Sequence, residues 1–119
     1  MSVTATREQT MSEKQLQSGV LQMLAHFGWK AVHFHDSSRE VRPGVLVGDK
    51  DAAGFPDVFA VRVRRGEARA LAIELKSEKG KLTKDQDEWL LAFEQVEGVE
   101  QHLWRPSDWF SGAIEAVLR

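Results

Sequence analysis

Three residues of this chain, Asp57, Glu74 and Lys76, have the types and the spacing to do chemistry together. Glu74 and Lys76 are two positions apart in a stretch that alternates like a β-strand, so their side chains point to one face. Two carboxylates placed side by side repel each other, and each must be neutralised by a proton or a cation. A cluster of this kind therefore predicts a cation site.

The pairing of two strands decides whether Asp57 joins that cluster. The sequence predicts strands at Asp57–Arg64 and Glu67–Lys76 around a two-residue turn at Arg65-Gly66, where glycine accepts a positive φ. Counting back from this turn puts Asp57 opposite Glu74, and opposite residues of a hairpin point to the same side. A slip of one residue would put the two carboxylates on different faces, whereas a slip of two would leave them neighbours.

Carboxylate oxygens of this kind suit Mg²⁺ or Mn²⁺, which bind one or two carboxylates, several waters and phosphate oxygens of a substrate. Such an ion can activate a water and stabilise the charge on a phosphodiester under attack. A lysine nearby can stabilise the same charge or help to position and deprotonate the water. A surface Glu74–Lys76 pair, with Asp57 in a turn after Pro56, explains the strand pattern equally well.

Glu13 favours the chemical interpretation. It lies three residues before Leu16 and seven before Val20, on the expected buried side of the first helix, where a lone carboxylate is poorly placed without a partner. A first-turn acid favoured by the helix dipole is the competing explanation.

Gln86, His33 and His35 could border the same site. Gln86 is in register with the apolar face of a later helix, although a capping box with Thr83 explains it almost as well. Two histidines at a spacing of two are more often packed or solvated than metal ligands, and no further His or Cys completes a zinc set.

The elements that must position these residues follow the order α-β-β-β-α-β-α. The expected elements are a helix capped by Ser12 and Gly28, a strand at Trp29–His35, the hairpin, a helix opened by Thr83, a strand at Val99–Trp104 and a helix opened by Ser107. Residues 36–54 form a long connection with room for a short strand at Val45–Val47, and long connections in compact domains tend to be functional or mobile.

The composition bounds the class of protein. A chain of 119 residues with 42% hydrophobic residues predicts one domain, with a frayed N-terminus at residues 1–11 and a folded part at 12–119. No apolar run is long enough to span a membrane, and no signal peptide is expected. The absence of cysteine fits a reducing cytoplasm, that of a host cell if the chain is viral.

The net charge of −2 argues mildly against a nucleic-acid partner, but the charges are unevenly distributed. Residues 58–84 carry eight basic and three acidic side chains, whereas residues 85–119 carry two basic and eight acidic ones. One face of the protein could be basic while the whole is acidic. Ordinary solvated charges explain the distribution at least as well.

Six segments together resemble a known family. GFPDVF at 54–59 and IELK at 73–76 resemble the PD-(D/E)XK nuclease signature. The helix start SEKQLQ, the GW before the first strand, the helix start KLTKDQDEWL and the closing WRPSDW resemble the VRR-NUC branch, the virus-type replication-repair nucleases, close to archaeal-type Holliday junction resolvases. Each motif is weak alone, but the set in this order covers nearly all of residues 12–118.

The resemblance implies a role for each residue of the cluster. Asp57 and Glu74 would ligate Mg²⁺ or Mn²⁺ with the Leu75 carbonyl, and Lys76 would act on the attacking water or the developing phosphate charge. Glu13 would complete the site and is a candidate further metal ligand, and Gln86 matches the glutamine that follows the signature strand. The cations expected to contact DNA are Lys79, Lys81, Lys84, Arg39 and Arg42.

The implied fold is an α/β, restriction-endonuclease-like αβββαβα core with a central mixed sheet flanked by helices. The leading hypothesis is a phage-type or bacterial Mg²⁺- or Mn²⁺-dependent endodeoxyribonuclease that acts as a homodimer on DNA junctions or flaps in replication, recombination or repair. The alternatives are a non-catalytic nucleic-acid-binding module on the same fold and a partner-binding protein that uses the acidic final helices. Loss of Asp57, Glu74 or Lys76 would mark the first alternative, and all three are present.

Overall fold

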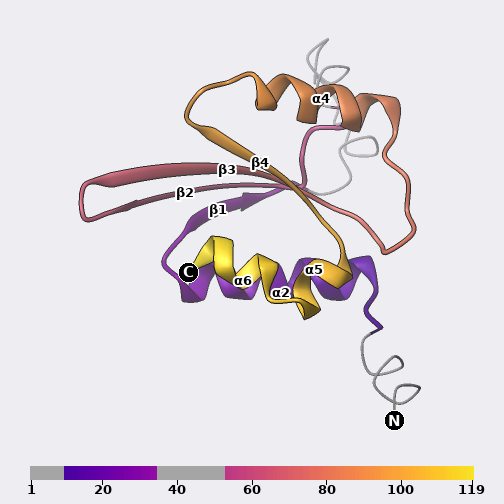
Figure 1. The fold of residues 1–119 in the computed structure, drawn as a ribbon, viewed down its shortest axis with the longest axis horizontal. Coiled ribbons are helices and arrows are strands. Elements are labelled where there is room, and N and C mark those ends of the chain that lie inside the picture. The colour runs from indigo at the N-terminus through magenta and orange to yellow at the C-terminus, as the bar shows by residue number, and fades with distance from the viewer. Residues whose placement is uncertain (1–9, 35–52) are drawn as a thin grey trace, which may run out of the picture.

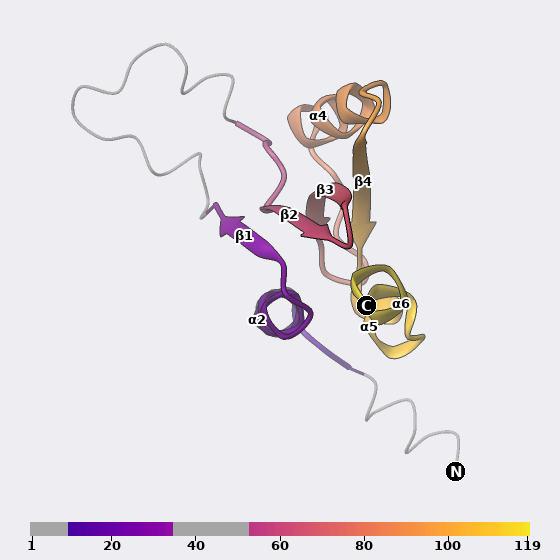
Figure 2. The same cartoon turned by 90° about the vertical axis from the view of Figure 1, so that its left-hand side faces the viewer.

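The computed structural model describes residues 10–34 and 53–119. A sheet lies between two helical layers, with α4 on one side and α2, α5 and α6 on the other (Figures 1 and 2). The elements in chain order are α2 (Glu13–His26), β1 (Lys30–His33), β2 (Val58–Arg64), β3 (Glu67–Leu75), α4 (Lys84–Glu94), β4 (Val99–Trp104), α5 (Pro106–Phe110) and α6 (Ala113–Leu118). The α/β class and the mixed sheet flanked by helices are as predicted.

The sheet has the order β1-β2-β3-β4, in which β1, β2 and β3 are antiparallel neighbours and β4 runs parallel to β3. The parallel pair is joined through α4, as a parallel pair requires a crossover connection. The β2–β3 hairpin turns at Arg65 and Gly66, with φ of 55° and 80°. Its ladder pairs Arg64 with Glu67 and Val58 with Ile73, so the predicted register is confirmed.

Capping boxes are present at the starts of α2 and α4. Ser12 and Gln15 exchange side-chain to backbone hydrogen bonds at the start of α2, and Thr83 and Gln86 do so at the start of α4. These bonds satisfy N–H groups that have no partner within the helix. The two helices therefore begin where the local sequence places them.

The core lies between β2 and β3 on one side and α2 and α6 on the other. The buried residues of this cluster come from both layers and include Leu16, Val20, Leu24, Val58, Ala60, Leu71, Ile73, Leu75, Ile114 and Leu118. Trp29 and Trp104 are buried in it, whereas Trp89 and Trp109 are only partly buried. No helix in the described ranges is long and apolar enough to cross a membrane.

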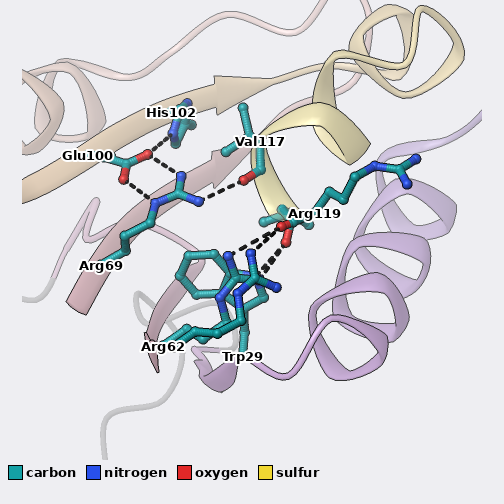
Figure 3. A network of polar contacts seen from close by, with 9 residues as sticks. Trp29, Arg62, Arg69, Glu100, His102, Val117 and Arg119 are labelled. Atoms are coloured by element: carbon teal, nitrogen blue, oxygen red, sulfur yellow. Dashed lines mark hydrogen bonds and ion pairs between the residues drawn. The ribbon is translucent and has the colours of Figure 1, made fainter. Parts of the chain in front are cut away.

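A buried arginine ties the hairpin to the last helix (Figure 3). The guanidinium of Arg62 donates to the backbone oxygens of Phe27 and Leu118 at 3.0 and 2.9 Å, and it stacks on the Trp29 ring at 4.3 Å. Burial lowers the pKa of Arg62, and the neighbouring cations Arg64 and Arg69 lower it further. Backbone carbonyls and an aromatic face replace the water that this cation loses on folding.

Each hairpin strand is one residue shorter than predicted, with β2 beginning at Val58 and β3 ending at Leu75, and two other elements differ more. The single last helix opened by Ser107 is wrong: α5 begins at Pro106 with Arg105 as N-cap, and α6 follows from Gly112. Gly112 has a φ of 88°, which cannot continue a right-handed helix, so the segment breaks in two. The first strand is shorter than expected, since it begins at Lys30 and ends at His33. The possible strand at Val45–Val47, the rest of the 36–54 connection up to residue 52 and His35 lie outside the described residues.

Candidate active site

The hairpin register places the two carboxylates across from each other. Asp57 immediately precedes β2, and Glu74 is the last but one residue of β3, one position beyond the Val58–Ile73 pair. Their carboxyl groups are close enough for a hydrogen bond when one of them carries a proton. The predicted proximity of Asp57 and Glu74 is therefore confirmed.

Asp57 is held by backbone contacts on two sides. Its Oδ2 accepts a hydrogen bond from the Leu75 N–H at 2.8 Å, and its carbonyl accepts one from the Phe34 N–H at 2.8 Å. Gly54, three residues earlier, has a φ of 80°, and a Cβ there would come within 2.7 Å of the Gln86 backbone nitrogen. The glycine of the GFPD motif thus lets this turn lie directly against the start of α4.

Burial makes the pair reluctant to hold two negative charges. Glu74 is only 1% exposed, and burial together with the charge of Asp57 raises its pKa to about 8, although Lys76 opposes the shift. Burial also raises the pKa of Asp57, against the hydrogen bond from Leu75. Without a cation, the pair therefore keeps a proton near neutral pH.

Lys76 follows the end of β3 and begins a loop that is held by hydrogen bonds to Trp104 and Arg105. Its backbone N–H donates to the Trp104 carbonyl at 3.1 Å. Arg105 donates through Nη1 to the carbonyls of Ser77 and Gly80, both at 2.7 Å. Arg105 thus holds the chain just after Lys76. Arg105 is not among the predicted site residues, although it lies in the WRPSDW segment.

The first helix approaches the pair with an exposed carboxylate. Glu13 is exposed at the start of α2, so its expected place on the buried side of the helix is wrong: the residues that α2 buries are Leu16, Val20 and Leu24. Its charge nevertheless raises the pKa of both Asp57 and Glu74. Glu13 therefore lies at the open side of the pair.

One turn further along α2, Gln17 contacts the site through a histidine. The Gln17 side-chain amide lies within hydrogen-bond distance of the imidazole of His33 on β1. His33 in turn lowers the pKa of Asp57. Gln17 is not among the predicted site residues, although its place four residues after Glu13 puts both on one helix face.

Gln86 lies beside the site but already has a structural task. Its Oε1 accepts a hydrogen bond from the Thr83 N–H at 2.9 Å, which is the capping interaction that competed with a functional reading. Lys79, Lys81 and Lys84 are exposed between β3 and α4 and at the start of α4. Arg39 and Arg42 lie outside the described residues.

The donor set fits a hard divalent cation. The Oε1 atom of Glu74 is buried without a hydrogen-bond partner, next to a second carboxylate, and a polar atom in that position is costly unless something neutralises it. Among residues 10–34 and 53–119, no three histidine, aspartate or glutamate side chains are grouped closely enough to hold a metal ion by themselves. Two carboxylates with further oxygens from backbone, water and substrate are the usual environment of Mg²⁺.

Residues 49–103 match the model of the VRR-NUC domain. This segment matches the family that the sequence motifs resemble. This is a nuclease family, and it implies DNA as the substrate.

The VRR-NUC match covers β2, β3, α4 and nearly all of β4, and with them Asp57, Glu74, Lys76 and Gln86. Glu13 on α2 falls outside it. No curated protein and no solved structure matches the chain significantly. The family and the local geometry therefore point to the same end of the hairpin.

Proposed function

We propose that this VRR-NUC protein is a Mg²⁺- or Mn²⁺-dependent endonuclease that hydrolyses phosphodiester bonds in DNA. One observation carries the proposal: the buried, unpartnered Oε1 of Glu74 lies beside Asp57, with Lys76 two residues further on. A fold that only needed stability would gain nothing from a buried carboxylate placed next to a second one. A site that has to bind a cation and a phosphate would need them.

Each residue of the cluster has a distinct task in this proposal. Asp57 and Glu74 would hold the ion together with the Leu75 carbonyl, and the Leu75 N–H fixes the Asp57 carboxylate from the opposite side. When bound, the ion supplies Lewis acidity and lowers the pKa of a bound water. The ammonium of Lys76 stabilises the negative charge that develops on the phosphate, or orients the attacking water. Glu13 adds negative charge at the open side of the pair.

The substrate that we propose is branched DNA, a junction or a flap. The exposed Lys79, Lys81 and Lys84 follow Lys76 directly and would contact backbone phosphates next to the bond that is cut. Paired cuts at a four-way junction require two active sites, so we propose a two-fold homodimer in which each copy supplies one. The cytoplasm, of a bacterium or of a phage host, is the proposed compartment.

Cleavage of linear, flap and four-way DNA with Mg²⁺ or Mn²⁺ tests the proposal. Asp57→Ala and Lys76→Met should each lower the single-turnover rate at saturating DNA by about 10²-fold or more, since each removes a preorganised charge at the reacting phosphate. Lys79→Met is the matched control: it removes a lysine three residues away, so it should weaken binding without changing the saturated rate.

Wild-type cleavage equal to that of Asp57→Ala and Lys76→Met would refute catalysis at this site. Binding of branched DNA without any cleavage would identify a non-catalytic nucleic-acid-binding module instead. A protein that neither binds nor cleaves DNA in these assays would instead be a partner-binding protein.

A further inference from the structure

The far end of the β2–β3 hairpin carries a group of arginines that the proposed site does not use. The hairpin projects beyond β1 and the C-terminal helix (Figure 1). Arg64, Arg65 and Glu67 at its tip, together with Arg119, surround a hollow of about 610 Å³. Arg64 and Arg65 face one acid there, in a chain whose net charge is −2, whereas the guanidinium of Arg119 pairs with Glu115.

The other two arginines of the hairpin are occupied by the fold (Figure 3). Arg62 is buried against backbone oxygens and the Trp29 ring. Arg69 makes a two-pronged ion pair with Glu100, with distances of 2.7 and 2.8 Å, and holds the pKa of Glu100 below its usual value. Neither guanidinium is available to a ligand without breaking these contacts.

Arg64 and Arg65 are committed far less. Arg64 donates one hydrogen bond, from Nη2 to the backbone oxygen of Arg119 at 2.9 Å, and a guanidinium has five N–H donors. The Arg65 side chain makes no hydrogen bond or ion pair within the described residues. Both side chains are exposed, so they can reach an anion in solution.

Arg65 also has a backbone conformation that disfavours arginine. Its φ of 55° makes it the one non-glycine residue with positive φ in the described ranges. A two-residue turn of this type favours Asn-Gly or Gly-Gly, because other side chains crowd the left-handed conformation. An arginine that costs stability here and makes no hydrogen bond or ion pair in the described fold suggests that its charge serves an external partner.

The hairpin also sets the distance between this tip and the carboxylate pair. The 7 residues of β2 separate Asp57 from the turn. At about 3.3 Å per residue this is about 23 Å. Duplex DNA rises about 3.4 Å per base pair, so the same length corresponds to about seven base pairs.

We propose that the basic tip formed by Arg64 and Arg65 is a second phosphate-binding surface, which takes the backbone of a duplex arm about seven base pairs from the bond that is cut. This inference rests on the proposed nuclease function, because it defines the arm by its distance from that site. Guanidinium groups suit it, since they bind phosphate oxygens in pairs. Glu67 at the edge of the hollow limits the affinity, so the arm is held but can be released.

Arg65→Asn gives the sharpest test, because a role of Arg65 in the fold and a role in phosphate binding predict different results. Asparagine tolerates the positive φ, so the unfolding temperature should be unchanged or higher. The affinity for a flap or junction measured in EDTA should nevertheless fall by about three- to tenfold near 0.1 M salt, and the slope of log affinity against log salt should fall by about one. Lys30→Asn is the matched control, because it removes one exposed positive charge from β1. Lys30 lies opposite Val61, on the face of the sheet that Arg64 does not occupy. This variant should leave the dependence of affinity on arm length unchanged.

Arm length provides the second measurement. Wild type should gain affinity when the arm is extended from about four to about ten base pairs, and Arg65→Asn should lose most of that gain. Glu67→Gln should increase the gain, because it removes the acid from the hollow. An Arg65→Asn variant that binds both arms as wild type does would overturn the inference.

The two proposals fail separately. Binding in EDTA tests the tip, whereas cleavage with Mg²⁺ tests the carboxylate pair. If the wild type cleaves DNA but its affinity and rate do not depend on arm length, the second phosphate-binding surface is refuted and the nuclease function stands. If the wild type never cleaves DNA, the proposed nuclease function is refuted. The arm can then no longer be defined by its distance from the bond that is cut.

Discussion

Replacing Glu74 by glutamine should stabilise the metal-free protein at neutral and alkaline pH. Glutamine has nearly the same shape but cannot ionise, so it removes the free-energy cost of a carboxyl group at this buried position without leaving a cavity. Glu74 is 1% exposed, and its Oε1 has no hydrogen-bond partner. The carboxylate is therefore a cost to the fold when no cation is present.

The pKa of Glu74 sets the size and the pH range of this effect. Burial raises that pKa from 4.5 to about 8. Between these values the folded protein keeps a proton that the unfolded chain releases, so the free energy of unfolding falls as the pH rises. At about 1.4 kcal/mol per pH unit, the carboxyl destabilises the protein by about 3 kcal/mol at pH 7 and somewhat more above pH 8. Below pH 4.5 both states are protonated and the cost disappears.

Urea denaturation of both proteins in EDTA, at several pH values between 5 and 9, measures this cost. The difference in unfolding free energy between Glu74→Gln and wild type should increase with pH, and taking the difference cancels contributions from other groups such as His102. Glu88→Gln, an exposed position on α4, is the matched control and should change stability by less than about 0.5 kcal/mol.

Saturating Mg²⁺ should then remove most of this difference near pH 7. An ion bound to the folded state at about a hundred times its dissociation constant adds about 2.7 kcal/mol to wild type, whereas the glutamine variant should gain much less. A difference that does not change with pH would refute the buried-charge reasoning. An equal response of both proteins to Mg²⁺ would refute the assignment of Glu74 as a ligand.

Two further substitutions test the contacts that position the site. Arg62→Met should destabilise the protein by about 2–4 kcal/mol in urea denaturation, because the backbone oxygens of Phe27 and Leu118 lose a charged donor; an unchanged midpoint would show that water satisfies these oxygens. Gly54→Ala should cost about 2–4 kcal/mol, because of the positive φ of 80° and a Cβ 2.6 Å from the Asp85 backbone, and it should also slow cleavage by displacing Asp57. A stable Gly54→Ala variant with full activity would contradict the close approach of this turn to α4.

The sequence alone determined the local parts of this protein. The Arg65-Gly66 turn fixed the hairpin register, because a two-residue turn leaves one pairing of its strands, and side-chain parity then brought Asp57 and Glu74 together. The two capping boxes fixed the starts of α2 and α4 for a similar reason, since each involves residues three positions apart. The catalytic roles of Asp57, Glu74, Lys76, Glu13 and Gln86 remain predictions.

Tertiary structure decided what depends on distant contacts. The burial of Glu74, and hence its raised pKa, follows from packing of the whole sheet, whereas Glu13 is exposed despite its place near the apolar face of α2. Arg105 holds the loop after Lys76 from 28 positions away, and Trp29 bonds the Leu118 carbonyl from 89 positions away. Such contacts leave no periodic pattern in a sequence, because periodicity reports only which face of its own element a residue occupies. The chemistry of the carboxylate pair could therefore be predicted from local spacing, but its electrostatic strength is set by everything that excludes water from it.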